Sequence, residues 1–356
     1  MSAVDSRPGL PASRGCLVVG LAAAVLLAGG AILWPSAVAM GWLVGFAFWS
    51  SLPIGAIVLA LIHGTTGGRW GLAAAPTLRL FCLCALLSPL FFIVLAFSVT
   101  LIYPWAREGS SIAPDVARLM LNTRLYAVYA LVALLGWAAI ALLLAAGRLG
   151  LLGASLSLVF HGIAISVVPV AWLLSVDPRF TDSGFGAEVA VQQILFPLAA
   201  IAALSPARAI AIAKDDIATL LLASALGAFY LGLMTFIVKW YGDQPDDAAW
   251  YLARAHGLAF ALLLGALVFG AAVPILACAW ERIRTSARAM RLVGLCTMLG
   301  IFLHDLWLVN LTLFAVLAAL ASLAVMAGLS LGLAPFVDRL FGGLLLNHAR
   351  PREAET

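Results

Sequence analysis

Ten long apolar segments follow one another along the chain, with only short polar connections between them. They lie at approximately 16–34, 37–63, 80–103, 125–146, 151–174, 188–207, 217–238, 256–279, 290–309 and 311–334. A helix needs about 20 mostly apolar residues to cross the hydrocarbon core of a bilayer, so each segment is long enough to do so. The apolar runs are continuous rather than alternating, which favours helices over the strands of a barrel. We therefore predict an all-α polytopic membrane protein of about ten transmembrane helices.

The composition supports a bilayer as the solvent of this chain. Hydrophobic residues make up 64% of the 356 residues and charged residues only 10%, whereas soluble domains carry about 25% charged residues. The connections are too short for a soluble domain. We expect a single transmembrane domain at 16–334, an N-terminal segment at 1–15 and a C-terminal tail at 335–356.

The distribution of Lys and Arg predicts the orientation. With the N-terminus inside, fourteen basic residues fall on the cytoplasmic side and six on the other, so the positive-inside rule places both termini in the cytoplasm. The net charge of +4 then needs no nucleic-acid partner. A cleaved signal peptide is an alternative, because Ala37-Val38-Ala39 is similar to a cleavage site, but the first segment is longer than a signal core and a helical hairpin is favoured.

Cysteine and histidine positions bear on cofactors. The five cysteines are scattered, with no C-x-x-C-H haem attachment and no cysteine run for an iron–sulfur cluster. We therefore expect no covalently bound redox centre and no metal site. An intramembrane haem needs two histidines at one depth on neighbouring helices, and a pairing of His161 with His304 is the arrangement that stays open.

Two histidines and an aspartate fall inside predicted spans. His161 lies near the middle of the fifth span, and His304 is followed directly by Asp305 in the ninth. Ionisable groups at membrane depth are costly and usually face a partner or a water-filled cavity. Adjacent helix positions do not face each other, so His304 and Asp305 each need a partner from another helix. The short connection to the tenth span also allows both to lie near the outer surface, in contact with water.

Three polar connections have unusual compositions. The first, at 63–71, begins with His63 and is rich in glycine, and the second, at 175–180, contains an Asp-Pro turn. In the third, aromatic residues bracket an acidic, proline-containing turn, a composition typical of a rigid loop at the membrane interface. Its distinctive residues are Trp240, Gly242, Asp243, Pro245, Trp250, Tyr251 and Arg254.

These connections, in this order, resemble the membrane subunits of alternative complex III, a bacterial quinol:cytochrome c oxidoreductase. These subunits belong to the polysulfide-reductase-type membrane-anchor superfamily, and the similarity is to the second of the two quinone-subunit-like proteins. The resemblance covers about 40–310, and the loop after the seventh span is its most specific element. The supporting motifs are Phe48-Trp49, His63 to Gly71, Ser175-Val176-Asp177-Pro178 and Asp305-Leu306-Trp307.

The resemblance implies two four-helix bundles, spans 2–5 and 6–9, flanked by spans 1 and 10, in the bacterial inner membrane. It implies as partners a multihaem c-type cytochrome, an iron–sulfur protein and a second homologous membrane subunit, which would carry the haem and iron–sulfur centres. This chain is expected to be a non-catalytic or quinone-interacting subunit. The family's acidic residue on the fifth span is Ala171 here, which favours a structural role with a partial proton path. The candidate proton-path or quinone-contact residues are His63, His161, Tyr230, His304 and Asp305.

A stand-alone secondary transporter is the alternative function. Prolines inside the spans could break helices around a midplane site, although the second half of the chain does not repeat the charge or loop pattern of the first. A membrane enzyme acting on lipid is a weaker third reading, because no nucleophile–base pair or metal-ligand cluster falls at one membrane face.

Overall fold

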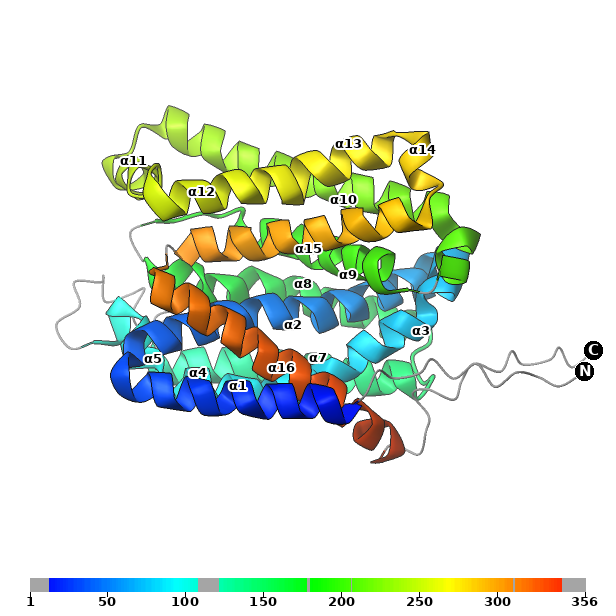
Figure 1. Ribbon diagram of the computed structural model, residues 1–356, viewed down its shortest axis with the longest axis horizontal. Helices are drawn as coiled ribbons and strands as arrows, with labels where there is room; N and C mark the ends of the chain where they lie inside the picture. The colour runs from blue at the N-terminus through cyan, green and yellow to red at the C-terminus, as the bar shows by residue number, and fades with distance from the viewer. Residues whose placement is uncertain (1–12, 108–121, 178–179, 206, 310, 341–356) are drawn as a thin grey trace, which may run out of the picture.

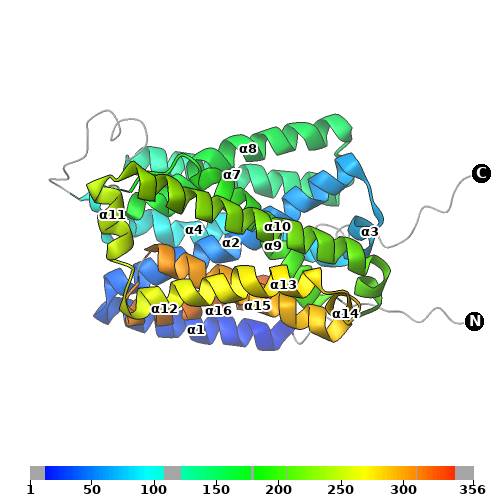
Figure 2. The ribbon, with the colours of Figure 1, turned by 90° about the horizontal axis from the view of Figure 1, so that it is seen from above.

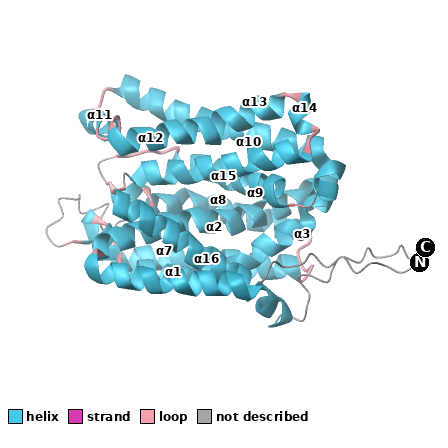
Figure 3. Cartoon of the chain, in the orientation of Figure 1, coloured by secondary structure: helices cyan, strands magenta, loops and turns pink. Residues whose placement is uncertain are grey.

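The computed structural model describes residues 13–107, 122–177, 180–205, 207–309 and 311–340, and these are helical apart from short turns (Figure 3). Most of the predicted N-terminal segment at 1–15 and the part of the tail after residue 340 lie outside the described residues. Within the described ranges there is no strand. Ten helical segments are long and apolar enough to cross a membrane. The prediction of a polytopic helical membrane protein is confirmed.

Six of the ten spans are single helices, one is a helix with a kink, two are interrupted helices, and one continues into a short 3-10 turn. The single helices are α1 (Ser13–Leu33), α2 (Pro35–Thr66), α7 (Thr123–Ala145), α9 (Phe185–Leu204), α15 (Ala287–Val309) and α16 (Leu313–Leu340). The kinked helix is α10 (Ala207–Gly242), whose backbone is not helical at Ala213. The third span comprises α3 (Arg69–Cys84), η1 (Ala85–Leu87) and α4 (Ser88–Phe97), and the fifth comprises α8 (Leu151–Trp172) and η3 (Leu174–Val176). The eighth comprises α12 (Gly257–Ala266), the π-helical η4 (Leu267–Ala272) and α13 (Val273–Ala279).

Short helices cap the two ends of the molecule. Near one end lie α5 (Val99–Ile102), η2 (Pro104–Ala106) and α11 (Pro245–Leu252), and near the other lies α14 (Glu281–Arg284). The start of α1 and the end of α16 lie at the α14 end (Figure 1). A chain with an even number of spans must begin and end on the same side of the membrane, as α1 and α16 do here.

The third span begins earlier than the sequence predicted. Its helix starts at Arg69, whereas we expected the span from residue 80 after a longer connection. Gly67 and Gly68 have φ values of 75° and 111°, which glycine adopts without steric cost. The turn between α2 and α3 is therefore only two residues long. Arg69 and Arg79 lower the apolar content of the helix start, which is why the hydropathy pattern did not reveal it.

The spans form two groups of four. In the first, α2 packs against α3, α4, α7 and α8; in the second, α9 packs against α10 and α15, and α15 packs against α12, η4 and α13. The groups join where α9 contacts α2 and α8, and α1 and α16 flank the first group beside α2. Helix α2 is the most deeply buried span, while α1 and α10 are the most exposed.

The second group of helices contains the candidate site. Helices α10 and α12 diverge toward the end where α11 joins them (Figure 2). Helix α10 packs extensively against α13, near the α14 end, and less against η4. The backbones of these helices are thus closer together at the α14 end than near α11.

Candidate functional site

A cavity of about 390 Å³ lies inside the second bundle. Helices α9, α10, α12 and α15 line its walls together with η4, and residues from the segment before α9 and from α11 close one end. Its volume falls in the range of about 300–1,000 Å³ that is typical of small-molecule sites. Most of the lining is aliphatic or aromatic. The polar lining residues are Asp182, Glu188, Gln192, Thr235, Tyr251 and His304.

The polar wall of this cavity centres on α9 and α15. The Nε2 atom of His304 lies 3.4 Å from Oε1 of Glu188, an ion-pair distance if the imidazole is protonated. The side-chain amide of Gln192 donates a hydrogen bond of 3.1 Å to Oδ1 of Asp305. A second contact of 3.9 Å joins His304 Nδ1 to the same carboxylate. His304 and Asp305 thus each have a partner from another helix, as the sequence predicted.

Local helix geometry explains how these four side chains meet. Glu188 and Gln192 are one turn apart on α9, so they share a face of the helix. Glu188 also lies in the first turn of α9, where the helix dipole stabilises a negative charge. A void of about 10 Å³, lined by Ser51, Glu188, Gln192, His304 and Asp305 among others, continues from the cluster toward α2. Such a void is about large enough for one water molecule.

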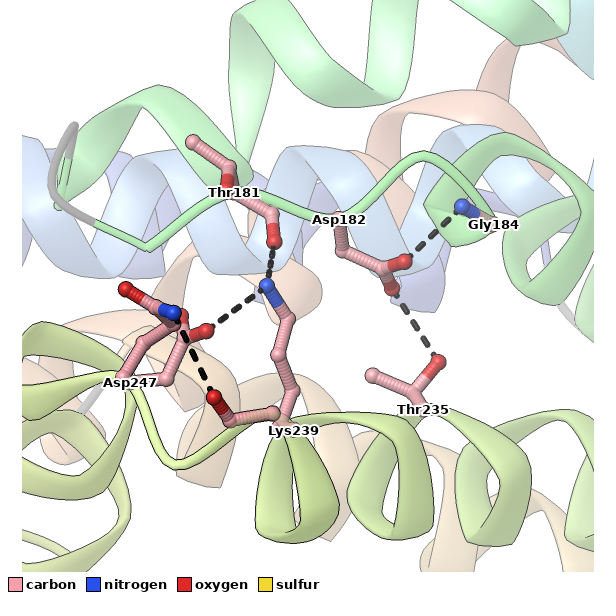
Figure 4. A network of polar contacts seen from close by, with 8 residues as sticks. Thr181, Asp182, Gly184, Thr235, Lys239 and Asp247 are labelled. Carbon is pink, nitrogen blue, oxygen red and sulfur yellow. Dashed lines mark hydrogen bonds and ion pairs between the residues drawn. The ribbon is translucent and has the colours of Figure 1, made fainter.

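A second polar network ties α10 to the segment before α9, beside the cavity (Figure 4). Asp182 accepts a 2.8 Å hydrogen bond from the Gly184 backbone N–H and one of 3.2 Å from the Thr235 hydroxyl. Lys239 forms a 3.1 Å ion pair with Asp247 on α11 and donates to the carbonyl oxygen of Thr181. These contacts fix the end of α10 against both connecting segments.

An aromatic cluster closes the cavity at the α11 end. Trp250 stacks on Phe180 at 4.1 Å between ring centroids and meets Trp307 edge to face at 5.3 Å. The guanidinium of Arg254 lies 3.7 Å from the centroid of Trp250. It donates hydrogen bonds to the carbonyl oxygens of Trp250 and Leu308. Arg254 thereby holds α11 against the end of α15.

Tyr251 lies beside this cluster, outside the spans. Burial raises the pKa of Tyr251 above its usual value, and the neighbouring carboxylates of Glu188, Asp182 and Asp247 raise it further, against an opposing effect of Arg254. Its hydroxyl therefore stays protonated well into the alkaline range.

The remaining residues of the predicted interface loop take different roles. Trp240 is 72% exposed. Gly242 ends α10, Asp243 has a φ of 47°, and Pro245 is the first residue of α11. The loop is thus a sharp turn into a short helix, with an exposed tryptophan on one side and buried Trp250 and Arg254 on the other.

The structure brings together only two of the five predicted proton-path or quinone-contact residues, His304 and Asp305. His63 lies where α2 ends, with Nδ1 3.1 Å from the Gly67 carbonyl oxygen. His161 is buried in the first bundle, its ring 6.0 Å from that of Trp137. Tyr230 is 58% exposed on α10 and is not part of the cavity lining. The cavity therefore does not extend to these three residues.

Sequence reasoning missed Glu188, Gln192 and Asp182. The available signal was an acidic residue at the start of a predicted span, with a second polar residue one helical turn later. Ionisable residues in such positions are candidates for function by default. Among the described residues, no group of three or more His, Cys, Asp or Glu side chains is arranged to hold a metal ion.

Compared with known protein families and with curated proteins, the chain matches none.

Proposed function

We propose that this chain is an integral membrane subunit of a quinol:cytochrome c oxidoreductase-like respiratory complex, and that quinol contacts it in the cavity of the second bundle. The observation that carries the proposal is an apolar cavity of about 390 Å³ with one polar wall. A quinol matches this division, since its ring is apolar and its two hydroxyl groups need hydrogen-bond acceptors.

The polar wall is rich in acceptors. Asp182 and Glu188 contribute carboxylates to the lining, and Asp305 lies directly behind Gln192 and His304. A ligand that donates hydrogen bonds suits such a wall better than one that only accepts them, because each carboxylate has lone pairs left to accept further bonds and, when ionised, no proton to donate. The cavity therefore favours a hydroxyl-bearing ring over the oxidised quinone.

Glu188 as a carboxylate and His304 as a neutral imidazole can also receive the two protons that a quinol releases when it loses two electrons. The void behind them provides room for one water molecule toward Ser51 on α2. In this proposal the electrons leave to haem and iron–sulfur centres on partner subunits, namely a multihaem c-type cytochrome and an iron–sulfur protein. A second homologous membrane subunit completes the proposed assembly.

We place the protein in the bacterial inner membrane with both termini in the cytoplasm. The start of α1 and the end of α16 lie at the same end of the molecule (Figure 1), which supports a topology with both termini on one side of the membrane. The basic residues Arg69, Arg282, Arg284 and Arg288 lie on or beside α3 and α14 at that same end. The positive-inside rule assigns such an end to the cytoplasm, which places the polar wall near the opposite surface.

Purification of tagged protein in mild detergent tests the proposal. We expect mass spectrometry to find a multihaem cytochrome and an iron–sulfur protein, and a reduced-minus-oxidised spectrum to show haem. A colourless protein that purifies alone would contradict the proposal and favour a stand-alone transporter, for which the acidic cavity would be the substrate site.

A further inference from the structure

We infer that the cavity is loaded sideways from the bilayer, through an opening between α10 and η4, by an amphiphile whose aliphatic tail stays in that opening. The identification of the head as a quinol rests on the proposed function. The inference of an opening and of a tail within it depends only on the shape of the second bundle.

Four large apolar side chains define the opening, because each lines the cavity and is also exposed. Phe229, Leu233 and Phe236 on α10 are 41%, 39% and 40% exposed, and Leu267 on η4 is 43% exposed. These exposed side chains stand on both α10 and η4, at the edge where the cavity meets the outer surface of the bundle. The cavity therefore continues to the lipid-facing surface between these helices.

The packing of η4 explains why the helices stay apart at this position. A Cβ atom at Gly300 on α15 would overlap the backbone of Gly270 on η4, so the two glycines allow these helices to cross at backbone contact. Helix η4 packs mainly on α15 and much less on α10. The eighth span is thus held on the far side of the cavity, which leaves the α10 side open.

A glycine on α10 brings the opening close to the polar wall. Gly232 lines the cavity next to Leu233, and a Cβ atom added there would lie 3.6 Å from Oε1 of Glu188. A ring that passes the opening at this position therefore reaches the carboxylate directly.

The distribution of polarity identifies the occupant. The opening is bounded by apolar side chains, whereas carboxylates and His304 lie at the inner wall, and stacked Trp250 closes the α11 end. A water-soluble substrate would gain nothing from this entrance. A lipid-soluble molecule with a hydrogen-bond-donating head and a hydrocarbon tail fits both parts.

The test compares a tailed quinol with its tail-less ring on the full chain in lipid nanodiscs. Decylubiquinol and 2,3-dimethoxy-5-methylhydroquinone are titrated under anaerobic conditions by calorimetry, with empty nanodiscs subtracted. Leu233→Trp fills the opening. Leu226→Trp is the matched control, because Leu226 is an exposed residue of the same helix that does not line the cavity.

We expect Leu233→Trp to weaken decylubiquinol binding about tenfold, equivalent to the loss of roughly two buried CH₂ groups. Binding of the tail-less ring should stay unchanged, and Leu226→Trp should bind both compounds like the wild type. Equal effects on the two compounds, no effect on either, or a wild-type chain that binds neither would overturn the inference. If Leu233→Trp does not yield folded protein, Leu267→Trp on the opposite side of the opening makes the same comparison.

These outcomes are separable from those of the proposed function. Tail-selective binding by a chain that purifies without redox partners would retain the opening and reject the respiratory complex. Co-purification with redox partners, without tail-selective binding, would support the respiratory complex and reject the opening.

Discussion

The crossing of Gly300 and Gly270 makes a quantitative prediction about stability. In Gly300→Ala, the added methyl group would overlap backbone atoms of Phe269 and Gly270 rather than the end of a flexible side chain. The clash is therefore relieved only if η4 moves away from α15. Overpacking of this kind costs about 1–3 kcal/mol, against a gain of about 0.5–1 kcal/mol from replacing glycine by alanine in a helix. We expect a net destabilisation of about 1–2 kcal/mol.

Gly162→Ala is the matched control for this substitution. Gly162 is an exposed residue inside α8, and a Cβ atom added there would meet no atom within 4 Å. This variant should show only the helix-propensity gain, so its unfolding midpoint should rise or stay the same.

Unfolding by SDS in mixed micelles, followed by tryptophan fluorescence, measures both variants against the wild type. The reasoning predicts midpoint shifts of opposite sign, or a fall for Gly300→Ala with no change for Gly162→Ala. Equal midpoints, or a rise for Gly300→Ala, would show that backbone contact between η4 and α15 does not hold the eighth span in place.

Three further predictions concern the cavity and the cluster that closes it. Glu188→Gln keeps the size of the side chain but removes the charge facing His304, and it should weaken quinol binding about tenfold in calorimetry; unchanged affinity would remove Glu188 from the ligand site. Arg254→Ala removes the hydrogen bonds to the Trp250 and Leu308 carbonyls and should lower stability by roughly 2–3 kcal/mol, with faster proteolysis at α11; protease resistance equal to the wild type would contradict the anchoring role. Burial raises the pKa of Tyr251, so the contribution of this tyrosine to stability is fully present below its unfolded pKa and is lost as pH rises through its folded pKa. Difference absorbance of wild type against Tyr251→Phe should show tyrosinate forming at a higher pH than in an exposed tyrosine. Ionisation at the ordinary pKa would refute the burial argument.

The architecture follows largely from the sequence because membrane helices must be long, apolar and internally hydrogen bonded. The apolar runs predict all ten spans, and adjacent positions in a helix predict that His304 and Asp305 need partners elsewhere. The predicted start of the third span, at residue 80, was wrong, because Arg69 and Arg79 lower the hydropathy of a segment that is nevertheless helical.

The site itself depended on packing that no local pattern encodes. Which helix faces His304 is decided by the contact between α9 and α15, so Glu188 could be flagged as an acid in a span but not assigned as its partner. The glycine crossing at Gly300 and the π-helical turn of η4 also form part of the cavity lining. These are properties of helix pairs, and hydropathy read along one helix does not report them.

The quinone content of the purified protein tests the central claim most directly. Wild type and Glu188→Gln are purified from their native membrane, extracted with organic solvent, and assayed for quinone relative to protein and to lipid phosphorus. We predict equimolar quinone in the wild type, well above the lipid background, and a clear loss in the variant. Quinone at the lipid background in both proteins would contradict the account of this cavity as a quinol site.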